Sequence, residues 1–76
     1  MSENVLDLKG LLCPMPVVKI AQAIKNVAIG DTIEALATDP GVLADIPAWA
    51  RSTGNELVVI EKNDNKDIRF VVKRVK

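Results

Sequence analysis

The chain has 76 residues, which leaves room for one domain with one hydrophobic core. Hydrophobic residues make up 49% of it, and ten basic residues balance ten acidic ones. This composition excludes a disordered chain and argues against a protein whose main role is to coat nucleic acid or an anionic membrane. With one cysteine and no histidine, the chain can form neither an internal disulfide nor a zinc site of its own. We therefore expect a single domain over residues 1–76, with no metal and no cofactor.

The first third of the chain predicts a strand followed by a helix. Residues 4–10 alternate, with Leu6 and Leu8 on one side and charged residues on the other, as in a short strand that ends at Gly10. From Pro14 onward the apolar spacing becomes helical. The apolar positions of this segment are Val17, Ile20, Ala21, Ile24 and Val27 or Ala28. We expect a helix of about four turns that begins at Pro14.

The middle of the chain predicts a second strand and a second helical region. Residues 31–39 alternate again, and residues 38–55 carry apolar residues at helical spacing. Pro47 lies inside this helical region, where a proline is harmless only among the first few positions. Either the helix begins near Asp45, which would cap it, or residues 39–44 form a separate turn that leads into it.

Two further strands complete the pattern. Residues 56–62 and 67–75 are rich in Val and Ile, and the turn cluster NDNKD between them predicts an antiparallel pair. The order is strand, helix, strand, helix, strand, strand. We therefore expect an α/β (α+β) fold, a two-layer βαβαββ sandwich in which two helices cover one face of a four-stranded mixed sheet.

The single cysteine stands in the stretch CPMP, at the start of the first predicted helix. If Pro14 is the first helical residue, Pro16 is the third, and both are tolerated because the N–H groups that they lack would have no partner. Cys13 then falls at the N-cap, where the helix dipole favours a thiolate or a persulfide anion. The alternative is that Cys13 is a small buried apolar residue. A dithiol oxidoreductase is excluded, since no second cysteine exists.

The stretch LDLKGLLCPMPVVKI, residues 6–20, resembles the opening of the TusA family, small sulfur-carrier proteins also described as SirA-like or YedF/YeeD-like. Their signature is a Cys-Pro-x-Pro motif at the start of the first helix, preceded by a Leu-Asp-x-x-Gly strand. A second block also matches, with Gly-Asp at 30–31, Asp-Pro at 39–40, Asp-Ile-Pro at 45–47 and Gly-Asn-Glu-Leu at 54–57. The resemblance covers nearly the whole chain.

The resemblance implies a role in sulfur relay. A family member accepts sulfane sulfur as a persulfide from a donor protein of the cysteine desulfurase or rhodanese type and passes it to an acceptor protein. Pathways served by the family include tRNA thiolation, molybdenum-cofactor metabolism and sulfur oxidation. Cys13 takes the place of the persulfide carrier, and Pro14 and Pro16 take the scaffold positions. This implies a sulfurtransferase-type carrier that works with partner enzymes and is not a stand-alone enzyme.

Partners need a surface beside the sulfur. Leu11, Leu12 and Met15 flank Cys13 and would form a small apolar docking surface. A carrier that exposes its sulfur to two successive partners is best served as a monomer. The polar N-terminus and the lack of an apolar run of about 20 residues predict a cytoplasmic protein with no membrane contact.

Basic residues gather at the end of the chain. Five of them and one acid lie between Lys66 and Lys76, so this end is locally +4. It is either a solvated strand with a basic face or a docking surface for an acidic partner.

Two other functions compete with the sulfur carrier. One is a binding or regulatory module on the same fold. The other is RNA binding, against which the neutral net charge and the two aromatic residues argue.

Overall fold

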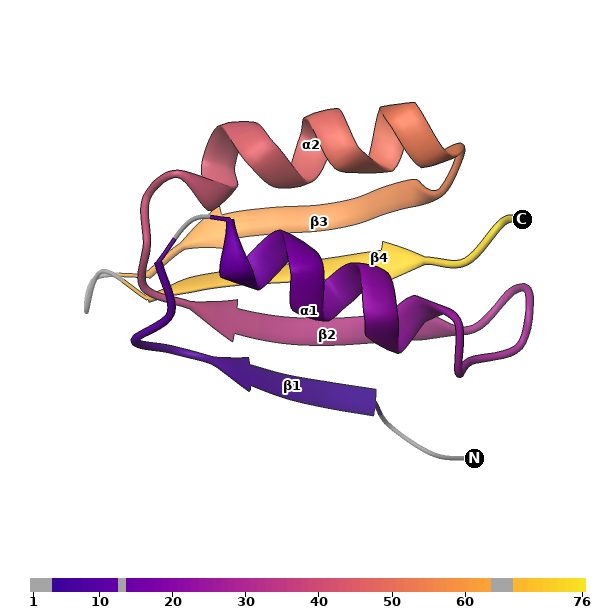
Figure 1. Cartoon of the computed structure of the whole chain (residues 1–76), viewed down its shortest axis with the longest axis horizontal. Helices are drawn as coiled ribbons and strands as arrows, with labels where there is room; N and C mark the ends of the chain where they lie inside the picture. Colours follow the sequence, from indigo (N-terminus) through magenta and orange to yellow (C-terminus); the bar gives the residue numbers. More distant parts are fainter. Residues whose placement is uncertain (1–3, 13, 64–66) are drawn as a thin grey trace.

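The computed structural model describes residues 4–12, 14–63 and 67–76. Its elements follow the predicted order (Figure 1). They are β1 (Asn4–Leu8), α1 (Met15–Ile24), β2 (Thr32–Ala37), α2 (Val42–Thr53), β3 (Glu56–Lys62) and β4 (Ile68–Lys73).

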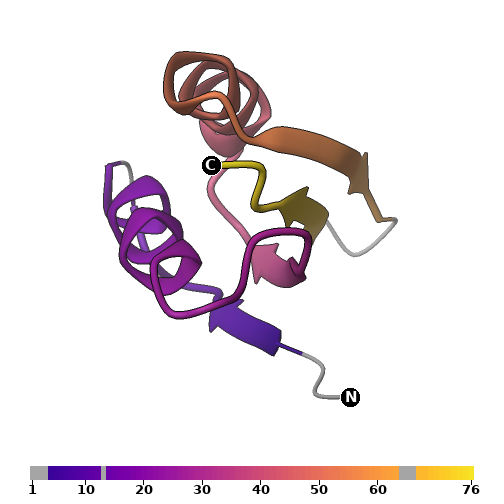
Figure 2. The ribbon, with the colours of Figure 1, turned by 90° about the vertical axis from the view of Figure 1, so that its right-hand side faces the viewer.

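The four strands form one mixed sheet in the order β1-β2-β4-β3. β1 pairs with β2 in parallel, while β4 is antiparallel to both β2 and β3. Figure 2 shows both helices on the same face of this sheet. The predicted two-layer βαβαββ sandwich is therefore confirmed.

The core lies between the helices and the sheet. β4 buries Ile68, Phe70 and Val72, and β2 buries its alternate residues in the same way. From the helical layer, Ile20 and Ile46 are completely buried against them. The period of two in the strands and of about 3.6 in the helices therefore places one apolar face of each element in a single core.

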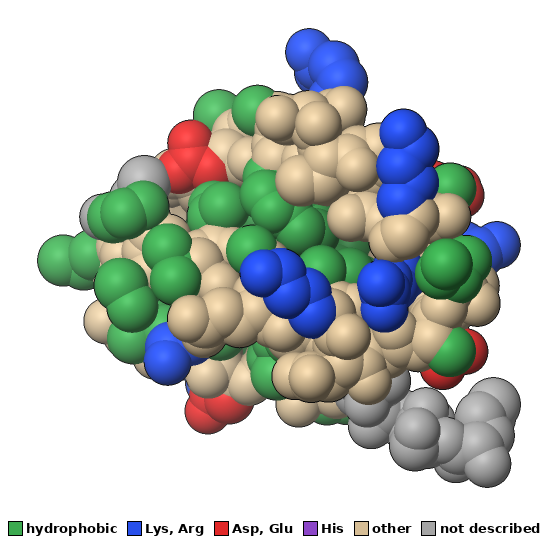
Figure 3. Space-filling view, turned by 45° about the vertical axis from the view of Figure 1, so that its right-hand side comes forward, with side chains coloured by type: hydrophobic (Ala, Val, Ile, Leu, Met, Phe, Trp, Pro, Cys, Tyr) green, Lys and Arg blue, Asp and Glu red, His purple; other side chains and the backbone are tan. Residues whose placement is uncertain are grey.

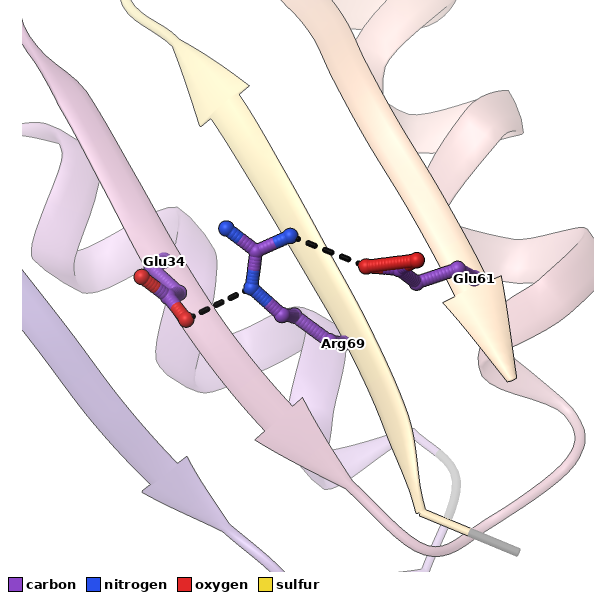
Figure 4. A network of polar contacts seen from close by, with 3 residues as sticks. All are labelled: Glu34, Glu61 and Arg69. Atoms are coloured by element: carbon purple, nitrogen blue, oxygen red, sulfur yellow. Dashed lines mark hydrogen bonds and ion pairs between the residues drawn. The ribbon is translucent and has the colours of Figure 1, made fainter. Parts of the chain in front are cut away.

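The opposite face of the sheet carries no helix. It holds a charged network that crosses three adjacent strands, β2, β4 and β3. Arg69 on β4 donates from Nε to Glu34 on β2 at 2.7 Å and from Nη1 to Glu61 on β3 at 3.0 Å (Figure 4). The hydrogen bonds to Glu34 and then to Glu61 raise the pKa of Arg69 above its ordinary value. One of the five basic residues near the chain end is thus neutralised on the sheet face.

Helix α1 is shorter than predicted at both ends. It begins at Met15 and ends at Ile24, which is about three turns. At its end the N–H of Asn26 donates to Ala23 O at 3.0 Å, three residues back, so the last turn tightens into 3₁₀ geometry. Val27 is still buried, although it lies beyond the helix. Periodicity alone therefore overestimated the length.

Both expectations for Pro47 are wrong, because α2 begins at Val42 and Pro47 is its sixth residue. The first turn is closed by backbone bonds such as Leu43 N–H to Pro40 O at 3.1 Å. Pro47 cannot donate to the carbonyl of Leu43, which costs the helix one hydrogen bond. Burial of Val42, Ile46 and Ala50 in the core holds the helix together across this gap.

Candidate functional site

The candidate site is the loop that joins β1 to α1, at the end of the molecule where both helices begin (Figure 1). Cys13, the predicted sulfur carrier, lies outside the described residues, so the placement of its sulfur stays a prediction. The residues on both sides of it are described. Leu11 N–H donates to Leu8 O at 3.3 Å, and Met15 N–H donates to Leu12 O at 2.8 Å. The chain therefore makes two tight turns between the strand and the helix.

The helix start is displaced by one residue from the prediction. Pro14 is the N-cap, with φ −96° and ψ 14°, and its carbonyl accepts the N–H of Val18 at 3.1 Å. Met15 and Pro16 are then the first and second helical residues instead of the second and third. The reason is the turn closed by Met15 and Leu12, which holds Pro14 in the bridge region outside helical geometry. The prediction that Cys13 is the N-cap is therefore wrong, and in the sequence Cys13 directly precedes the N-cap.

The two prolines of the motif differ in their surroundings. Pro16 is fully buried and anchors the first turn of α1 in the core, whereas the Pro14 side chain is exposed. Neither proline has an N–H, and both are tolerated because they lie at the N-cap and in the first turn. They restrict the backbone that follows Cys13 in the sequence. Their role as scaffold positions of the motif stays a prediction.

Exposed apolar side chains surround this loop. Leu12 is 73% exposed, Met15 40% and Val18 38%. We call Leu12, Met15 and Val18 the apolar patch. Val18 was not among the predicted docking residues, although its spacing of three from Met15 places it on the same helical face. Leu11, which was among them, is half-buried and packs against the core.

The loop between β2 and α2 lies beside the candidate site. Gly10 N–H donates to Oγ1 of Thr38 at 2.9 Å, a bond between residues 28 positions apart that ties the two loops together. Asp39 accepts the N–H of Gly41 at 3.0 Å through its side chain and so shapes the turn into α2. Leu43, near the start of α2, is 41% exposed. Sequence reasoning missed Thr38 and Leu43, which only the fold brings to this end.

The electrostatic setting at the start of α1 favours an anion. No acidic residue lies in the first turn of this helix, so its positive pole has no carboxylate there.

Among the described residues, no group of three or more His, Cys, Asp and Glu side chains could hold a metal ion. Within those same ranges, neither helix is long and apolar enough to cross a membrane.

Comparison with known proteins gives consistent results. Residues 4–74 match the family model of sulfurtransferase TusA. The sulfur carrier protein TusA of Allochromatium vinosum is 35% identical over 69 residues, which is 91% of this chain and 90% of that protein. A relative from Aquifex aeolicus is 39% identical over 93% of this chain, but the chain spans only 36% of that longer protein.

The fold also matches a solved structure. The SirA-like protein of Desulfitobacterium hafniense superposes with a TM-score of 0.82 over 95% of this chain and 97% of that one. Its sequence identity is 19%, so this match supports the fold.

Proposed function

Because the chain belongs to the TusA family, we propose that it is a sulfur carrier that accepts sulfane sulfur as a persulfide on Cys13 and passes it to an acceptor protein. One observation carries this proposal. The only cysteine of the chain stands directly before the N-cap of α1, inside the CPMP motif of residues matched to the family. The proposed carrier needs one ionisable thiol and no second thiol that would discharge the persulfide as a disulfide.

The proposed transfer is balanced without any other reagent. The Cys13 thiolate attacks the terminal sulfur of a donor cysteine persulfide and forms a new S–S bond. The S–S bond of the donor breaks, and the donor cysteine leaves as a thiolate. The same exchange with an acceptor thiolate unloads the carrier. No net oxidation occurs, because one persulfide is replaced by another.

The start of α1 would assist this step. A helix N-terminus lowers the pKa of a nearby thiol, because the positive pole of the helix stabilises the anion. The first turn of α1 holds no acidic side chain, whose negative charge would raise the pKa of the thiol again. Pro14 and Pro16 would hold the sulfur-bearing backbone in one conformation, with Pro16 fixed in the core.

The proposed partners are a donor protein of the cysteine desulfurase or rhodanese type and a protein acceptor. They would dock on the apolar patch, whose three side chains are exposed to solvent. We propose that the protein acts as a single-domain monomer in the cytoplasm, since one patch must serve both partners in turn. The acceptor would decide whether the sulfur enters tRNA thiolation, molybdenum-cofactor metabolism or sulfur oxidation.

Intact-protein mass spectrometry tests the proposal. The reduced chain is incubated with a cysteine desulfurase and cysteine, and separately with a rhodanese and thiosulfate. We expect a gain of one sulfur atom that a reductant reverses and that the Cys13→Ser variant lacks. Alkylation of the thiol before incubation should also prevent the gain.

A thiol that alkylates readily but gains no sulfur from either donor would contradict the proposal. A binding module on the same fold would then be the better reading. A gain of sulfur in Cys13→Ser would contradict it equally, because the sulfur would be attached elsewhere.

A further inference from the structure

A hollow of about 320 Å³ lies between the C-terminal halves of α1 and α2. Ala21 and Ile24 line it from α1, and Trp49 lines it from α2. Figure 3 shows this side of the molecule, where Lys and Arg side chains flank a groove with hydrophobic side chains in it. Both helices begin at the end of the molecule that holds the loop between β1 and α1, which we call the Cys13 loop. The hollow lies between their other ends, at the opposite end of the molecule (Figure 1).

Three cationic side chains, Lys25, Arg74 and Lys76, line the hollow together with these apolar residues. No Asp or Glu is among the lining residues, and within the described ranges no ion pair with an Asp or Glu side chain involves any of the three cations. The basic chain end therefore divides in two. Arg69 is neutralised on the open sheet face, whereas Arg74 and Lys76 join Lys25 at the hollow.

The C-terminal segment that carries these cations is held in place. Arg74 N–H donates to Asp31 O at 2.9 Å, and its Nη1 donates to Val27 O at 2.6 Å. Asn55 Oδ1 accepts the N–H of Val75 at 3.0 Å. Lys76 lies over Gly54, since a Cβ at Gly54 would stand 2.9 Å from Lys76 Cε. The wall of the hollow is thus built by contacts between distant segments.

These positions also place cations at the negative ends of both helices. Arg74 donates to the carbonyl of Lys25, the C-cap of α1, and Lys76 lies beside Gly54, the C-cap of α2. Each helix end carries about half a negative charge, which offsets part of the cationic charge. Arg74 Nε also donates to Lys76 O at 2.9 Å, so Nε and Nη1 of Arg74 are both engaged by backbone oxygens. The attraction of the hollow for anions therefore rests mainly on Lys25 and Lys76.

The charge and the lining of the hollow indicate which class of ligand it could bind. Lys25 follows α1 and Lys76 lies in the C-terminal segment, and both are exposed, so the cations suit charges that are spaced apart. Between them lies the apolar lining around Trp49, which suits an apolar side chain. The volume is at the lower end of the range for ligand pockets. An acidic polypeptide segment with an apolar residue in it has both properties.

We propose that this hollow docks an acidic segment of a partner protein, with an apolar side chain of the segment against Trp49 and flanking carboxylates on Lys25, Arg74 and Lys76. The contact goes beyond sulfur transfer and does not require Cys13. Because α1 of ten residues is about 15 Å long, a partner held at the hollow leaves the Cys13 loop free for exchange.

Trp49 makes the proposal directly measurable. It is the only tryptophan, and the chain has no tyrosine, so its fluorescence reports the hollow alone. The probe is a synthetic peptide with a Leu-Phe pair flanked on each side by three Asp or Glu residues. A matched peptide carries Asn and Gln in place of the acids. All titrations use the Cys13→Ser chain, so that failure here and failure of persulfide formation are separate results.

The test variants reverse one charge at a time. Lys25→Glu should raise the Kd of the acidic peptide about tenfold, because an attractive contact becomes repulsive. Lys25→Arg should bind like the parent chain. Arg51→Glu is the control, since Arg51 is exposed on α2 and outside the hollow, and its reversal should change the Kd about twofold at most at physiological salt. Circular dichroism checks that each variant is folded.

A saturable change in Trp49 emission with the acidic peptide, weakened selectively by Lys25→Glu, would support the proposal. It would be overturned by the absence of a saturable change, by equal binding of the Asn/Gln peptide, or by equal loss in Lys25→Glu and Arg51→Glu. Full competition by millimolar inorganic phosphate would also overturn it, because the site would then take small anions and not a polypeptide segment.

Discussion

The apolar patch makes a quantitative prediction for Leu12→Ser. Full burial of a leucine side chain is worth about 2 kcal/mol. Leu12 is 73% exposed, so only about 0.5 kcal/mol of this stabilises the folded chain, and about 1.5 kcal/mol is left for a partner to bury. We therefore expect the variant to remain folded and to lose affinity for its donor.

Two measurements separate these effects. Urea denaturation should show a decrease of about 0.5 kcal/mol in the free energy of unfolding of Leu12→Ser. Persulfide loading of Cys13 by the donor, followed by mass spectrometry, should show kcat/KM reduced about tenfold, since 1.4 kcal/mol corresponds to a factor of ten. Ile29→Ser is the matched control. Ile29 is 66% exposed, but it lies beyond the far end of α1.

The opposite pattern would refute the reasoning. If Leu12→Ser loads as fast as the parent chain, no partner buries Leu12 and the apolar patch is not the docking surface. If Ile29→Ser loses as much activity, the effect comes from general surface hydrophobicity. A loss of stability well above 1 kcal/mol would mean that Leu12 packs more closely in the fold than its exposure indicates.

Three further predictions concern stability, and each is measured by urea denaturation. Gly54→Ala should cost about as much as Gly30→Ala, approximately 1 kcal/mol, because both glycines have positive φ and a Cβ at Gly54 meets only the flexible end of the Lys76 side chain, which can move aside. A much larger cost at Gly54 would show that Lys76 is held firmly in place. Pro47→Ala should raise the free energy of unfolding by about 1 to 2 kcal/mol, since it restores a helical hydrogen bond, and a decrease would mean that the proline ring packs better than alanine. The pKa of Arg69 is raised in the folded chain, so its ion pairs stabilise the fold fully below its ordinary pKa. This stabilisation is lost only as pH rises through the raised pKa. Arg69→Gln should therefore destabilise the fold equally at about pH 6 and about pH 9. A difference between these pH values would show that another group titrates with the network.

Sequence reasoning succeeded where structure follows from local periodicity. Ile33 and Ala35 on β2 lie in the core as the alternation of residues 31–39 predicts. In α1, Ile20 is completely buried at the centre of its predicted apolar face. One face of each element must leave water, so the pattern alone sets the element type and the residues that face the core.

Element boundaries were less predictable. The start of α1 moved from Pro14 to Met15 because a turn bond to Leu12 holds the proline outside helical geometry. Pro47 lies inside α2 because burial of the neighbouring Ile46 outweighs one missing hydrogen bond. In both cases a specific contact overrides the local preference of proline, and residue type does not reveal that contact.

What the sequence by itself determined is the family motif around Cys13, the element order and the composition of the core. Only the tertiary structure decided which distant residues meet. It joins Gly10 to Thr38, and it brings Lys25 and Arg74, 49 positions apart, to one hollow. The physical reason is that periodicity records which side of an element avoids water, whereas contacts between elements depend on the pairing of the strands, which no single segment encodes.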